Sequence, residues 1–105
     1  MPKFLVRGSY AAAGMKDVQK NTGSGGEKEV AYVCKALGGT LDVMYFGLGE
    51  DDVFAIVDMP GTSQVANLCL AVRASGMKTS SLPLLTVAEM DRVLAENVSH
   101  QLPVG

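Results

Sequence analysis

The chain has 105 residues and a mass of 11.0 kDa, which fits a single domain with one hydrophobic core. Its formal net charge of -2 and its nine scattered Lys and Arg residues argue against a nucleic-acid-binding surface, because phosphate affinity needs clustered positive charge. The chain contains no run of roughly 20 apolar residues that could span a membrane, and its opening lacks the apolar core of a secretory signal peptide. Two cysteines, Cys34 and Cys69, are too few for a disulfide scaffold, so we expect both to pack as small buried side chains. A soluble, cytoplasmic protein is predicted.

The first predicted elements are a strand and an interrupted helix. Residues of alternating character from Lys3 to Tyr10 indicate a strand. Ala11–Lys20 permits a helix, but the turn-forming run Asn21–Gly26 is expected to break it. A second helical run, with the acidic Glu29 near its start to complement the helix dipole, should stop at Gly38.

The segment from Leu41 to Met59 predicts a hairpin with apolar residues on both faces. Its two β-rich runs, Leu41–Gly47 and Val53–Met59, flank the tight acidic turn Gly49–Asp52. In the first run we expect Leu41, Val43 and Tyr45 to oppose Asp42, Met44 and Phe46, and in the second run Val53, Ala55 and Val57 to oppose Phe54, Ile56 and Asp58. Only two of these twelve positions are charged, so neither face of the hairpin suits water.

The second half of the chain predicts a helix, a strand and another helix. Thr62 or Ser63 can cap a helix whose apolar stripe is formed by Val65, Leu68, Cys69 and Val72. A fourth strand is expected over Lys78–Leu85, with Pro83 at an edge or an end because proline donates no ladder hydrogen bond. Thr86–Glu89 matches a capping box for a last helix running to about Val98.

This order of elements predicts an α+β protein of the ferredoxin-like type, βαββαβ with an antiparallel sheet and an added C-terminal helix. Residues 1–98 should form one domain and residues 99–105 a loose tail. Helices then cover one face of the sheet, so the apolar second face needs another cover. We expect a second copy of the chain to supply it, because burying a few Leu, Phe or Ile side chains at roughly 1.5–3 kcal/mol each can drive a homodimer.

Three segments, PKFLVRGSY, LGGTLDVMYFGLGEDDVFAIVDMP and ASGMKTSSLPLLTVAEM, make the chain resemble the GYD-domain family of small, mostly bacterial proteins. The Gly-Tyr-Asp pattern that names the family falls at the hairpin, where Gly49 and Asp52 match and Asp51 replaces the usual Tyr. A second family pattern is met by Lys78-Thr79 and Leu82–Thr86. The resemblance implies a ferredoxin-like fold related to dimeric α+β barrels, in which two sheets face one another, and it implies no settled activity.

Five side chains are candidates for contacting a ligand at the sheet. Tyr10 and Tyr45 bring phenol groups to mainly apolar strand surfaces, where a hydroxyl can either orient a polar ligand or simply pack in the core. Arg7, on the other face of the first strand, could bind a carboxylate. Asp52 could serve as an acid or base. Lys78 could contact a ligand or complement the negative end of the preceding helix.

Three other patterns favour structural roles. The carboxylates of Glu50–Asp52 could bind a hard cation, but consecutive residues point in different directions, so a hairpin turn is the simpler interpretation. Gly23–Gly26 is expected to be a flexible linker, with a mobile lid as the alternative. His100 lies beyond the last helix without a fixed neighbour. No catalytic triad, metal site or cofactor is predicted.

The leading hypothesis is a homodimeric small-molecule-binding or interaction domain with an apolar cavity at the sheet face. The alternative is a cofactor-independent enzyme, monooxygenase- or isomerase-like, that uses Tyr10, Tyr45 or Asp52 as acid/base groups on a small apolar or aromatic compound. A third possibility is structural, with the partner's sheet filling the second face and leaving no cavity.

Overall fold

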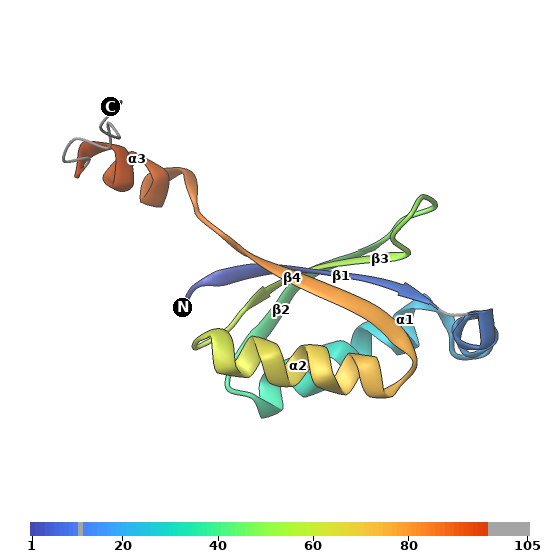
Figure 1. Ribbon diagram of the computed structural model, residues 1–105. Coiled ribbons are helices and arrows are strands. Elements are labelled where there is room, and N and C mark those ends of the chain that lie inside the picture. Colours follow the sequence, from blue (N-terminus) through green and yellow to red (C-terminus); the bar gives the residue numbers. More distant parts are fainter. Residues whose placement is uncertain (11, 97–105) are drawn as a thin grey trace, which may run out of the picture.

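The computed structural model describes residues 1–10 and 12–96, and within them it contains one four-stranded sheet and three helices (Figure 1). The elements are β1 (Lys3–Tyr10), α1 (Ala12–Ala36), β2 (Thr40–Phe46), β3 (Val53–Asp58), α2 (Thr62–Ala74), β4 (Met77–Leu84) and α3 (Val87–Ala95). The strand order is β2-β3-β1-β4, and each neighbouring pair is antiparallel. The predicted ferredoxin-like fold with a C-terminal helix is confirmed. The predicted tail, residues 99–105, and His100 lie outside the described residues.

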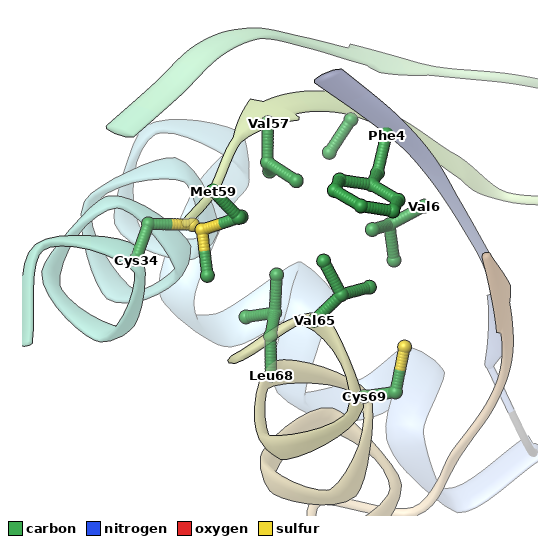
Figure 2. Close-up of a cluster of buried hydrophobic side chains, with 9 residues drawn as sticks. Phe4, Val6, Cys34, Val57, Met59, Val65, Leu68 and Cys69 are labelled. Atoms are coloured by element: carbon green, nitrogen blue, oxygen red, sulfur yellow. The ribbon is translucent and has the colours of Figure 1, made fainter. Parts of the chain in front are cut away.

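The hydrophobic core lies between the sheet and the two helices that cover one of its faces (Figures 1 and 2). Alternate residues of β1 and β3 point into it, as the period of two requires. Its members are Phe4, Val6, Cys34, Ala55, Val57, Met59, Val65, Leu68 and Cys69. Both cysteines are buried and unpaired, as predicted.

Helix α1 differs from the prediction because it is continuous through Asn21–Gly26. Close packing explains one of the glycines there, Gly23. A Cβ on Gly23 would lie 3.1 Å from the Phe46 ring, which is tighter than ordinary van der Waals contact, and one on Gly26 would lie 4.0 Å from Met44 Cε. Residues three apart share a helix face, so this run lets α1 lie close to β2. The predicted linker or lid is therefore wrong.

Strand β2 also departs from the predicted alternation. Its pairing with β3 shifts between Leu41 and Val43, which indicates a β-bulge at Asp42. Leu41 therefore lies opposite Val57 and packs against the core, whereas Val43 lies on the opposite face with Tyr45. The prediction that these three residues share one face is wrong at Leu41, because an inserted residue reverses the side on which every earlier side chain points.

Helix α2 and strand β4 follow the predictions except at one cap. Val65, Leu68 and Cys69 are the buried residues of α2. The predicted Thr62 or Ser63 cap is wrong, because Gly61 occupies the N-cap position and no side chain completes a capping hydrogen bond. Strand β4 lies at the edge of the sheet, where a proline leaves no ladder hydrogen bond unmade.

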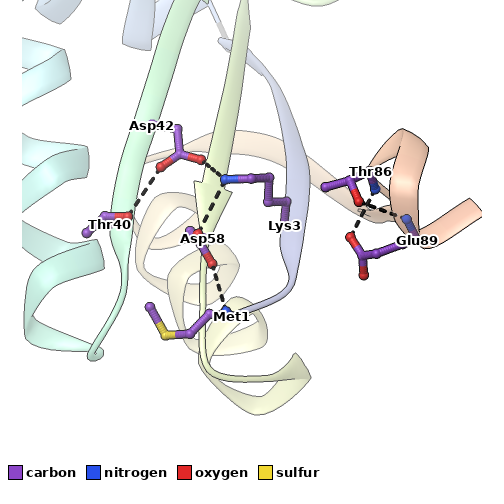
Figure 3. A network of polar contacts seen from close by, with 7 residues as sticks. All are labelled: Met1, Lys3, Thr40, Asp42, Asp58, Thr86 and Glu89. Carbon is purple, nitrogen blue, oxygen red and sulfur yellow. Dashed lines mark hydrogen bonds and ion pairs between the residues drawn. The ribbon is translucent and has the colours of Figure 1, made fainter.

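Neither α1 nor α2 covers the second face of the sheet, which we call the open face (Figure 1). By register and alternation it is formed by Leu5, Arg7, Val43, Tyr45, Phe54, Ile56, Lys78, Ser80 and Leu82. At one end of it Lys3 Nζ hydrogen-bonds to Asp42 Oδ2 and, at 3.3 Å, to Asp58 Oδ2 (Figure 3). These bonds, the one to Asp42 first, raise the pKa of Lys3. Both charged hairpin positions are thus paired, and the face beside them stays largely apolar.

Helix α3 follows β4 and stands clear of the sheet (Figure 1). The predicted capping box is confirmed: the Glu89 N–H donates to Thr86 Oγ1 (3.1 Å), and the Thr86 N–H donates to Glu89 Oε1 (3.0 Å; Figure 3). The helix ends at Ala95, three residues before the predicted end at Val98. Among the described helices, none is long and apolar enough to cross a membrane.

Candidate functional site

A cavity of about 180 Å³ lies between the sheet and the helices that cover it. Six elements contribute described residues to its wall, so it belongs to the body of the fold and not to a loop. The lining residues are Val6, Gly8, Tyr10, Gly26, Glu29, Val30, Val33, Met44, Val53, Ala55, Leu68, Ala71, Val72, Ser75, Met77 and Thr79. We call this hollow the helix-side cavity. It lies on the sheet face opposite to the one that the sequence hypothesis assigned to a cavity.

Two small residues lie on the wall of the cavity. Gly8 and Ala55 are neighbours on the sheet face beneath the helices, where most core positions carry larger side chains. A Cβ on Gly8 would lie 2.5 Å from Met77 Cε, so the missing side chain is what makes room for this methionine. Met44 and Met77 complete the wall, and their flexible thioether chains can adapt to the shape of an occupant.

Tyr10 supplies a phenol to the wall of the cavity and is held by the hairpin turn. Its backbone N–H donates to Asp52 Oδ2 (2.8 Å), and the Asp52 N–H donates to the Gly8 carbonyl oxygen (2.8 Å). Partial burial raises the pKa of the Tyr10 phenol, and the negative charges of Asp52 and Glu29 raise it further. The hydroxyl therefore stays protonated at neutral pH and can donate a hydrogen bond.

At the boundary of α2 and β4 the cavity wall is fixed by Arg73. Its Nε donates to Thr79 Oγ1 (3.2 Å) and its Nη2 donates to the Thr79 carbonyl oxygen (2.8 Å). Thr79 Oγ1 in turn lies 3.5 Å from the Cys69 carbonyl oxygen, which it can reach as a donor. These bonds hold the edge strand against α2, so Thr79 is a positioned wall residue.

The structure brings together two of the five predicted site residues and separates them from the other three. Tyr10 and Asp52 meet at the end of β1 beside the helix-side cavity. Arg7, Tyr45 and Lys78 lie on the open face, behind the sheet. Arg7 is half-buried, Lys78 is exposed and Tyr45 is 65% exposed. The five residues therefore cannot line one pocket within a single chain.

Glu29 is a lining residue that was not among the predicted site residues. It lies four residues before Val33 and three after Gly26, so it shares a side of α1 with these lining residues, and its side chain is exposed. That spacing was visible in the sequence. The predicted helix break placed Glu29 in the first turn of a new helix, where a carboxylate already has an ordinary role beside the helix dipole. Its position beside the cavity was therefore not predicted.

The acidic hairpin turn has a structural role. Asp52 connects β1, through Tyr10 and Gly8, to the turn, and its carbonyl oxygen accepts the Gly47 N–H (2.9 Å). Among the side chains that the structure describes, in residues 1–10 and 23–96, no three from His, Cys, Asp or Glu gather closely enough to hold a metal ion.

The fold and the cavity define a ferredoxin-like α+β domain with a hollow between its sheet and its helices. A sequence model of the GYD domain matches residues 4–94, nearly the whole chain, so the chain belongs to the GYD domain family. Comparison with curated proteins found no match.

Proposed function

We propose that this GYD-domain protein binds a small, mainly apolar molecule in the helix-side cavity. The observation that carries the proposal is a hollow of about 180 Å³ with mostly aliphatic walls and a few polar groups. An engineered cavity of about 150 Å³ lined by apolar side chains binds benzene. The helix-side cavity therefore has room for a molecule of about that size with one or two polar atoms.

The polar groups on the wall favour a neutral or cationic ligand. Tyr10 remains protonated and donates, whereas the Glu29 carboxylate accepts. No Lys or Arg is among the described residues that line the cavity. An apolar ligand with a hydroxyl or an amino group satisfies both side chains, and a carboxylate would meet Glu29 without a counter-charge.

The test compares three probes that share one ring: benzyl alcohol, benzylamine and benzoate. We expect the alcohol and the amine to raise the melting temperature and to give a calorimetric binding signal, and benzoate to give neither. Val72→Phe should abolish the signal because Val72 lines the cavity, whereas Leu70→Phe, at an exposed position of the same helix, should not. Equal binding by both variants would contradict the proposal.

A second candidate function is a cofactor-independent isomerase-like enzyme, favoured by two ionisable groups on one cavity wall. Glu29 would remove a proton from a carbon beside a carbonyl group, and Tyr10 would donate a proton to the carbonyl oxygen, giving the enol. Asp52 and Tyr45 suit this role less, because Asp52 accepts a backbone N–H and Tyr45 lies behind the sheet. In deuterium oxide, acetophenone should exchange its methyl protons faster with the protein than with Glu29→Gln, and equal rates would remove this candidate.

The proposal also takes residues 1–98 as one cytoplasmic domain that forms a homodimer through the open face. Leu5, Phe54, Ile56 and Leu82 are only partly buried there in a single chain. A covering partner would remove these apolar side chains from water.

A further inference from the structure

We propose that α3 of each chain packs on the open face of the partner's sheet, so that the homodimer is an exchange of C-terminal helices. This inference rests on the homodimer proposed above and names the element that closes it. It concerns the face opposite to the helix-side cavity, so ligand binding can be tested separately.

Helix α3 presents an apolar stripe that its own chain leaves uncovered. No residue of α3 is buried. Val87, Met90, Val93 and Leu94 are 82%, 43%, 47% and 58% exposed. At 100° per residue these four positions lie within one side of the helix, and the polar residues lie on the other. A stripe of this width is typical of a helix that packs against a surface.

A helix as short as α3 needs a surface against which to pack if it is to remain folded. Helix α3 has nine residues, and isolated helices shorter than about 12–15 residues are marginal in water. Its capping box lowers the cost of forming it but leaves the stripe in water. The GYD family match continues through residue 94, so this helix is part of the domain and not an appended tail.

The open face complements α3 in apolar side chains and in charge. It offers partly exposed apolar side chains together with Arg7 and Lys78. Helix α3 with its C-cap carries three acidic residues, Glu89, Asp91 and Glu96, against one basic residue, Arg92. Opposite charges on the two surfaces favour their association.

A second copy fits better than the chain's own helix because of the way β4 leads into α3. Only Leu85 and Thr86 join the two elements, and the helix continues away from the sheet (Figure 1). Short connections of this kind favour exchange between copies over folding back. Under two-fold symmetry each chain gives one helix and receives one, so both uncovered apolar surfaces become buried together.

The first experiment compares two neighbouring lysine substitutions by sedimentation at several concentrations. Leu94→Lys places a charge in the stripe, and Ala95→Lys places the same charge in the same turn on the other side. We expect Leu94→Lys to weaken dimerisation at least about tenfold, because it buries an unpaired charge. Ala95→Lys should dimerise as the native chain does. Equal behaviour of the two variants would overturn the exchange.

The second experiment asks whether α3 contacts its own sheet or the partner's. A copy with a spin label on Ala88→Cys, outside the stripe, is mixed with a second copy that carries labelled methyl groups and no spin label; Cys34 and Cys69 are buried and resist labelling. The exchange predicts stronger broadening of the open-face methyl groups of Leu5, Ile56 and Leu82 than of the core methyl groups of Val65 and Leu68. No such difference in a proven dimer would overturn the exchange and leave the homodimer standing. A monomeric native chain would overturn both, without affecting the test of ligand binding.

Discussion

The two faces of the sheet differ in how the chain completes them. The helix-covered face is closed within one chain by α1 and α2, and its core residues Val57 and Met59 have no exposed surface. The open face also carries apolar side chains, yet Tyr45 stays 65% exposed and Arg7 Nε lacks a partner within the described residues. One face of the sheet is therefore covered by helices of the same chain, and the other face is not.

This difference separates two kinds of function. A cavity beneath helices of the same chain keeps its shape in a single chain and suits a small molecule. A solvent-exposed apolar surface is stabilised when another surface covers it, which suits a protein partner. The proposed ligand site therefore lies on the helix side of the sheet, and the proposed association surface on the open side.

The largest expected effect compares equivalent truncations on the two faces. Leu68→Ala in the core should lower the free energy of unfolding by about 2–5 kcal/mol, because it leaves a void among packed side chains. Leu82→Ala on the open face should cost less in the monomer, since Leu82 is only partly buried there. Urea denaturation at concentrations below dimerisation measures both. Equal losses would show that the open face is closed within one chain.

The next effect tests the open face as an association surface. Ile56→Lys should weaken the homodimer by about 2–3 kcal/mol, because it removes an apolar side chain from the contact and adds an unpaired charge. Leu70→Lys is the control, since Leu70 is an exposed apolar residue on α2. Light scattering across a concentration series gives the two dissociation constants. A dimer unaffected by Ile56→Lys would move the interface to another surface.

A smaller effect tests the polar end of the helix-side cavity. Tyr10→Phe should weaken benzylamine or benzyl alcohol binding by about 0.5–1.5 kcal/mol, the net value of one hydrogen bond. The stability of the free protein should change little at neutral pH. Since the folded pKa of Tyr10 is raised above 10.0, its contribution to stability is present below pH 10 and is lost as the pH rises through the folded pKa. Calorimetry of the two variants checks the binding effect, and a stronger loss of binding would point to a larger role for the phenol.

The smallest effect concerns helix α3, which follows β4 and stands clear of the sheet (Figure 1). Hydrogen bonds to Thr86 lower the pKa of Glu89 below 4.5. The cap therefore stabilises α3 above pH 4.5 and stops doing so as the pH falls through the folded pKa of Glu89. NMR shifts of residues 87–95 should report a loss of helix on acidification. In Glu89→Gln this loss should be reduced, and an unchanged transition would assign it to another group.

Much of the fold followed from local patterns, and what did not follow depended on contacts between distant residues. The alternation in β1 and β3, the α2 stripe and the capping box of α3 act within one element, so they were predictable. The continuity of α1 depends on Gly23 meeting Phe46 of another element, which composition alone does not reveal. The bulge at Asp42 appears only in the pairing of β2 with β3.

The site was predictable only in part for the same reason. Tyr10 and Asp52 come together because β1 and β3 are adjacent strands of the sheet. Glu29 joins them through the packing of α1 on the sheet, and the predicted helix break concealed that position. Arg7, Tyr45 and Lys78 lie away from the cavity, and the strand pattern alone does not tell which face the helices will cover.

The most direct test of this division is a methyl-detected NMR titration of the labelled protein with benzylamine. The account predicts shifts at Val6, Val33 and Val72, which line the helix-side cavity, and unchanged signals from Leu5, Ile56 and Leu82 on the open face. Shifts confined to the open face would contradict it.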